Sequence, residues 1–272
     1  MPPKPQTFYV VLFPGFQLLD LAGPLDILNI LSLREEDGGG NISLKFVSES
    51  TAPVPTKAIP PVGADYEYYL PEAGGRPRNK AFNQYLVPDT TYEELLHKAE
   101  SGEETVDAVL IPGGAGTRMQ RKHQDGRVSR VCEELIEWLP KIGPHVRTAI
   151  LTVCTGSLVL AQAGLLDGRR ATTNMLKYDV VVPERPQVKW IKGARWIRSG
   201  EEDADKAGAK YGLELWSSAG ISAGMDLTLA FVAEYFGGIE VSRDIAKSLE
   251  YDWSEPKEAE ICKFYGRYFG VE

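Results

Sequence analysis

The 272-residue chain contains few of the residues that usually carry metal or redox chemistry. It has three histidines and three cysteines, the latter being Cys132, Cys154 and Cys262. No two cysteines form a Cys-x-x-Cys pair, and no histidine lies at metal-ligand spacing from a cysteine. The pattern therefore predicts no disulfide framework, no metal and no other cofactor. Free thiols are typical of a reducing compartment, which favours a cytoplasmic protein.

The chain also lacks a long apolar run and a basic face. No run approaches the roughly 20 apolar residues that span a bilayer. The apolar run near the N-terminus is interrupted at Pro14, too early for a signal peptide. The formal net charge is −8, and lysine and arginine are scattered along the chain. These absences argue against membrane insertion and nucleic-acid binding, so the expected partner is a small-molecule substrate.

Apolar runs alternate with helical patterns along most of the chain. We expect strands at 7–13, 42–47, 106–111, 149–153 and 213–218, and helices at 25–31, 91–100, 128–139, 158–163, 227–236 and 239–249. This alternation predicts an α/β fold with a mainly parallel sheet covered on both faces. No linker-like stretch interrupts it. We therefore expect a single domain over 1–272, with a proline-rich loop or hairpin insertion at about 50–105 and a charged loop at 201–210.

Cys154 marks the change from a strand to a helix. It follows the apolar run 149–153 and precedes a Thr-Gly-Ser sequence that starts the next helix. A nucleophile on such a strained turn is the arrangement of a nucleophile elbow. The helix N-terminus is expected to lower the thiol pKa, and its amides could hold an anion that develops beside the sulfur. The alternative is a buried and inert cysteine.

Two further loops are expected to meet Cys154 at the carboxyl end of the sheet, where ligands bind in such folds. Asp20 lies between two leucines in the loop before a helix, where it either caps backbone amides or faces a cleft. The sequence PGGAG at 112–116 fits neither a dinucleotide fingerprint nor a phosphate loop. It is either a plain turn or the segment that directs the Gly114 N–H toward the group that Cys154 attacks.

Taken together, five motifs resemble the DJ-1/PfpI superfamily, and their pattern is closest to its isonitrile hydratase branch. They are LDLAGPLDIL (19–28), LIPGG (110–114), VCTGSLVLAQAGLLDGRRATTN (153–174), SAGISAGMD (218–226) and LEYDW (249–253). The resemblance covers nearly the whole chain and implies a flavodoxin-like sandwich and a homodimer. Carried over by position, it implies Cys154 as the nucleophile and Asp20 as its acidic partner, with Gly114 and Thr155 as backbone donors.

The activity implied by the resemblance is hydration of an isonitrile to an N-substituted formamide, through a thioimidate on Cys154 with Asp20 as acid and base. Asn174 and Thr155 stand where other branches have histidines, which argues against peptidase or amidotransferase chemistry. Two alternatives remain open. One is a glyoxalase-type enzyme acting on α-oxoaldehydes, and the other is a non-enzymatic, redox-responsive protein in which Cys154 is oxidised.

Overall fold

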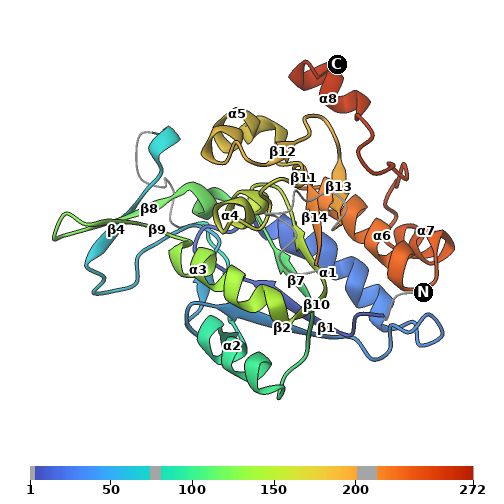
Figure 1. Cartoon of the computed structure of the whole chain (residues 1–272), viewed down its shortest axis with the longest axis horizontal. Coiled ribbons are helices and arrows are strands. Elements are labelled where there is room, and N and C mark those ends of the chain that lie inside the picture. The colour runs from blue at the N-terminus through green and yellow to red at the C-terminus, as the bar shows by residue number, and fades with distance from the viewer. Residues whose placement is uncertain (1–3, 74–80, 201–212, 272) are drawn as a thin grey trace.

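A seven-stranded sheet forms the centre of the computed structural model, which describes residues 4–73, 81–200 and 213–271 (Figure 1). The strand order is β13-β14-β10-β7-β1-β2-β6. All neighbours are parallel except β13, which runs antiparallel to β14. The strands are β1 (Thr7–Val11), β2 (Ser43–Ser48), β6 (Thr90–Thr91), β7 (Val106–Ile111), β10 (Val146–Thr152), β13 (Trp196–Ser199) and β14 (Glu214–Ser218). The predicted flavodoxin-like sandwich with a mainly parallel sheet is thus confirmed.

Helices cover both faces of this sheet, which explains why its central strands are continuous apolar runs. One layer contains α1 (Leu18–Ser32), α6 (Ala223–Tyr235) and α7 (Ile239–Ser248), which pack against one another. The other layer contains α2 (Tyr92–Ser101), α3 (Glu133–Ile142) and α4 (Gly156–Gln162) (Figure 1). Val10, Val109 and Ile150, on three neighbouring strands, are completely buried between these layers.

Part of the segment 50–105 forms small sheets outside the sandwich. β3 (Val54–Pro55) pairs with β5 (Tyr85–Leu86), and β4 (Tyr66–Tyr69) joins β8 (Gln120–His123) and β9 (Val128–Arg130) in an antiparallel arm (Figure 1). The short helix η1 (Pro71–Ala73) follows β4. By contrast, β6 and α2 belong to the central layers, so the hairpin structure of this segment ends before residue 90.

Two expected elements differ from the structure. Val128 was placed in a helix with the residues that follow it, but it lies in β9, because it pairs with Lys122 of β8; the helix α3 begins at Glu133. Asp20 was placed in the loop before a helix, but α1 already begins at Leu18 and Asp20 lies in its first turn. The charged loop expected at 201–210 lies outside the described residues.

The remaining short elements are β11 (Arg170–Ala171), β12 (Lys189–Trp190), α5 (Tyr178–Val181), the 3-10 helices η2 (Ala115–Arg118), η3 (Gly143–His145), η4 (Met175–Lys177) and η5 (Val182–Glu184), and a final helix α8 (Lys263–Phe269). Tyr265 of α8 is buried in a small apolar cluster with Met175 of η4. This contact braces the segment that follows Asn174. Over the described ranges, no helix is long and apolar enough to cross a membrane.

Candidate active site

Cys154 occupies a strained turn between β10 and α4. Its φ is +57°, a left-handed conformation that residues other than glycine rarely adopt. The turn is held from two sides: the Cys154 N–H donates to the carbonyl of Ala219 at 3.0 Å, and the preceding N–H donates to Ile111 at 3.0 Å. Such strain persists only where neighbouring structure enforces it. These hydrogen bonds therefore fix the direction of the Cys154 side chain. That geometry is the one expected of a nucleophile elbow.

The carboxyl group of Asp20 is completely buried beside this turn. Its Oδ2 accepts a hydrogen bond from the Gly113 N–H at 2.9 Å, whereas its Oδ1 accepts none from the described part of the chain. Burial raises the pKa of Asp20 to about 7, against smaller lowering effects of the Gly113 amide and the Cys154 thiol. A carboxyl group that titrates near neutral pH can both accept and donate a proton during a reaction.

The pKa of the Cys154 thiol is raised, whereas its place at a helix N-terminus predicts a lowered one. The side chain is only 7% exposed, and burial, together with the smaller effect of the nearby Asp20 charge, raises the pKa of the thiol to about 12. The Thr155 backbone, the Asn174 amide and the charge of Arg118 lower it by less. The predicted lowering of this pKa is therefore wrong, because desolvation outweighs the helix N-terminus. At neutral pH the thiol is protonated, and Asp20 is the group of the pair that titrates.

Gly113 lies in the narrow space between the side chains of Cys154 and Asp20. A Cβ at this position would lie 2.9 Å from Oδ2 of Asp20, 2.8 Å from Cβ of Cys154 and 2.5 Å from the Thr155 nitrogen. The N–H of Gly114, expected to face the reacting group, instead donates to Oγ1 of Thr155 at 3.1 Å. Gly114 thus orients the Thr155 side chain, while the Thr155 backbone acts on the thiol.

Two residues to which sequence reasoning gave no role in the chemistry complete the site. Asn174 donates a hydrogen bond from Nδ2 to Sγ of Cys154 at 3.2 Å. In the sequence, the residue was notable only because relatives have a histidine at this position. Arg118 donates from Nη1 to Oγ1 of Thr155 at 3.1 Å and from Nε to Glu72 at 2.6 Å. Arg118 had no sequence signal, because its position depends on the turn made by η2. Both residues favour a negative charge on the sulfur.

The described residues contain no group of three or more His, Cys, Asp or Glu side chains arranged to hold a metal ion. The hydrogen bonds that they make to Cys154 and Asp20 do not involve a histidine. His123, which contacts Asp65 at 3.3 Å, lies on the antiparallel arm. The chemistry of this site therefore rests on a thiol, a carboxyl group, an amide and backbone N–H groups.

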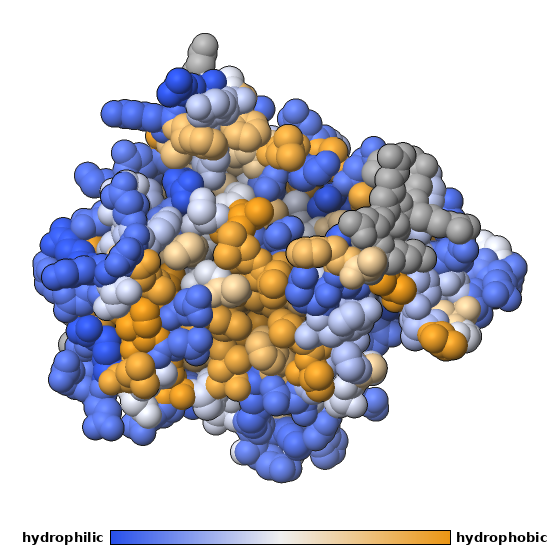
Figure 2. All heavy atoms as spheres, turned by 180° about the vertical axis from the view of Figure 1, so that it is seen from behind, coloured by the Kyte–Doolittle hydropathy of each residue, from blue (hydrophilic) through white to orange (hydrophobic). Residues whose placement is uncertain are grey.

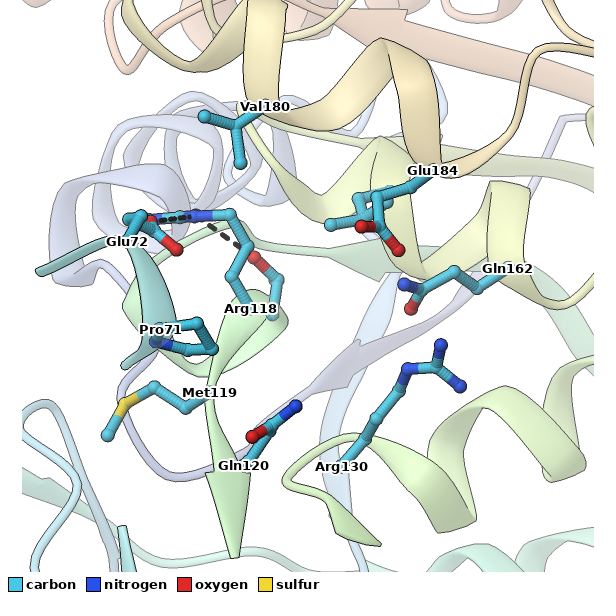
Figure 3. A pocket seen from close by; sticks show the side chains of 11 residues that line it. Pro71, Glu72, Arg118, Met119, Gln120, Arg130, Gln162, Val180 and Glu184 are labelled. Atoms are coloured by element: carbon cyan, nitrogen blue, oxygen red, sulfur yellow. Dashed lines mark hydrogen bonds and ion pairs between the residues drawn. The ribbon is translucent and has the colours of Figure 1, made fainter. Parts of the chain in front are cut away.

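A cavity of about 420 Å³ lies beside α4, as Figure 3 shows. Cys154 and Asp20 do not line it, but three of its lining residues lie near them. Leu158 lies one helical turn after Cys154, and Thr117 and Arg118 both contact Thr155. The cavity thus lies next to residues that surround Cys154, although Cys154 itself does not line it.

Comparison with known proteins agrees with this architecture. The sequence profile described as "DJ-1/PfpI family" matches residues 6–234. An isonitrile hydratase from Pseudomonas putida is 25% identical over 251 residues, which cover 90% of this chain and 78% of that protein. Among solved structures, a ThiJ/PfpI family protein from Pseudomonas syringae superimposes with a TM-score of 0.55 at 20% identity, covering 93% of this chain and 76% of that one. DJ-1beta from Drosophila melanogaster has a TM-score of 0.55 at 16% identity, with 91% and 99% covered.

Proposed function

Because the chain belongs to the DJ-1/PfpI family, we propose that it is a cysteine-dependent hydratase that converts an isonitrile into an N-substituted formamide. The observation that carries the proposal is the pairing of Cys154, on its strained turn, with a buried Asp20 whose pKa is about 7. The identity to an isonitrile hydratase along most of the chain supports the same reaction class. Thiol and carboxyl group together supply the nucleophile and the proton carrier that this hydration requires.

The first step joins the substrate to the sulfur. Asp20, as carboxylate, takes the thiol proton while Sγ forms a bond to the terminal carbon of the isonitrile, and the same proton is delivered to that carbon. The product is a thioimidate, R–N=CH–S–Cys154. The Asn174 amide and the Thr155 backbone N–H stabilise the negative charge that builds on the sulfur before the new bond forms.

The second step releases the product. Asp20 accepts a proton from water as the hydroxide adds to the thioimidate carbon, and it passes this proton to the nitrogen. The resulting tetrahedral species, R–NH–CH(OH)–S–Cys154, expels the sulfur; its hydroxyl proton is transferred through Asp20 to the sulfur, and the formamide R–NH–CHO leaves. One water is consumed, and the free thiol and the carboxylate are restored. Covalent attack thus divides one difficult hydration into two easier additions.

The test is steady-state hydration of cyclohexyl isonitrile by the purified full chain, with the formamide quantified by mass spectrometry. We expect turnover by the wild type, none by Cys154→Ala or Asp20→Asn, and full activity in the matched control Cys262→Ala, which removes a partly exposed thiol near the C-terminus. A wild type that is inactive at millimolar isonitrile, or a Cys154→Ala variant that retains activity, would refute the proposal.

We also propose that the chain forms a homodimer through the face that carries α1 and α6. Figure 2 shows apolar side chains gathered at the centre of this face. Leu19 of α1 is 48% exposed, and Leu18, Leu25, Ile30 and Met225 are partly exposed around the same helix pair. Sedimentation velocity is expected to show a dimer that Leu19→Glu dissociates and Val128→Glu, on the arm, leaves intact. A monomeric wild type would contradict the dimer.

A further inference from the structure

Two of the charged side chains in the cavity beside α4 are not neutralised by the protein. Four charged residues line this cavity. Arg118 and Glu72 form an ion pair at 2.6 Å. Arg130 and Glu184 form no ion pair with any other residue in the described ranges, nor with each other. Figure 3 shows both side chains reaching into the space, with the amide of Gln162 between them. The cavity therefore presents one free positive and one free negative group to whatever occupies it.

The uncharged part of the lining is mixed. Leu158 and Met119 are buried apolar residues and Val180 is 39% exposed, whereas the polar members are Thr117, Gln120 and Gln162. A volume of about 420 Å³ is in the range of small-molecule sites. An occupant that fits must thus be small, must have an apolar body and must carry two opposite charges.

We propose that this cavity binds a small zwitterion with an apolar side chain, such as a free amino acid. Its carboxylate pairs with the guanidinium of Arg130, which offers paired N–H donors to a carboxylate. Its ammonium group pairs with Glu184. A ligand with only one charge would satisfy one of these residues and be repelled by the other. The site requires no assumption about the reaction at Cys154, because neither Arg130 nor Glu184 contacts the catalytic pair.

Isothermal titration of the full chain at low ionic strength tests this with three probes. L-Leucine carries both charges, isocaproate lacks the ammonium group, and isoamylamine lacks the carboxylate. We expect leucine to bind one site, and Arg130→Gln and Glu184→Gln each to weaken it about tenfold. The single-charge probes should respond with opposite signs: Glu184→Gln tightens isocaproate, and Arg130→Gln tightens isoamylamine. Arg127→Gln is the matched control, since Arg127 is exposed on the same arm and pairs with Asp125.

Absence of saturable leucine binding at millimolar concentrations would overturn the proposal. So would an Arg127→Gln variant that weakens leucine as much as Arg130→Gln does, because the effect would then come from overall surface charge. Arg130 and Glu184 are both exposed, so their replacement is not expected to unfold the chain, and thermal unfolding of each variant checks this.

Discussion

The side-chain amide of Asn174 donates a hydrogen bond to Sγ of Cys154 at 3.2 Å. The orientation of this amide is set by its other end, because Oδ1 of Asn174 accepts the backbone N–H of Lys177 at 3.1 Å. A side-chain amide does not ionise near neutral pH and so cannot act as a general acid or base. Asn174 can therefore stabilise a thiolate but cannot serve as its base, which is why the proposed reaction assigns proton transfer to Asp20.

Removing the Asn174 amide should slow the reaction without unfolding the protein. In Asn174→Ala the developing thiolate loses a donor, so we expect kcat to fall about 10- to 100-fold and the thiol pKa to rise. The measurement is kcat for isonitrile hydration, together with the pH dependence of thiol alkylation. A variant with wild-type kcat would show that this hydrogen bond has no role in the transition state.

The activity should depend on the protonation of Asp20. The first step needs Asp20 as a carboxylate, and its pKa is about 7. We therefore expect kcat/KM to decrease as the pH falls through about 7. A pH–rate profile from 5 to 9 checks this. A profile that is flat across neutral pH would mean that another group carries the proton.

The burial of Asp20 should also affect stability, in the opposite pH direction. Because its pKa is higher in the folded chain than in the unfolded one, the folded state binds the extra proton between about pH 4 and 7. The favourable contribution of the protonated group is complete below about pH 4 and is lost as the pH rises through 7.

The matched comparison is Asp20→Asn, whose side chain does not titrate. Its free energy of unfolding relative to the wild type should increase between pH 5 and 8, by an amount on the order of a few kcal/mol at most. Urea unfolding at several pH values measures this. An unchanged difference between the two proteins would indicate that Asp20 is ionised in the fold throughout this range.

A methyl group at position 113 should damage both the fold and the site. In Gly113→Ala the new Cβ overlaps the Thr155 nitrogen, Cβ of Cys154 and Oδ2 of Asp20. We expect a loss of about 1–3 kcal/mol in stability and of most of the activity. Gly40→Ala is the control, since its Cβ meets mainly the flexible side chain of Glu35. Equal melting temperatures for the two variants would contradict the close packing described around Gly113.

The three thiols should differ in their reactivity toward iodoacetamide at pH 8. Cys132 and Cys154 are buried, and burial raises the pKa of each well above its ordinary value, whereas Cys262 is partly exposed. We expect Cys262 to be alkylated first, because the thiolate is the reactive form and must be accessible. Peptide mass spectrometry measures the order. Rapid alkylation of Cys154 in the absence of substrate would contradict the burial and the raised pKa of its thiol.

Much of the architecture could be predicted from local patterns. β1 and the C-terminal parts of β7 and β10 are apolar runs because both faces of the sheet are covered there, so consecutive residues are apolar and the strands can be recognised locally. The position of Cys154 at the end of β10 follows from the same pattern. Val128 was misassigned because its apolar spacing resembles a helix, while its actual partner is Lys122 of another strand.

The sequence by itself determined the sandwich, the turn at Cys154 and the proximity of Asp20, since parallel strands bring their carboxyl ends to one edge. Only the tertiary structure decided the chemistry of these groups. Gly113 reaches Asp20 across 93 residues, and Gly114 reaches Thr155 across 41. Segments that are distant in the sequence thus bury Cys154 and Asp20 and supply their hydrogen-bond partners. Local pattern therefore predicted a thiol with a lowered pKa, whereas the folded environment raises the pKa of both Cys154 and Asp20.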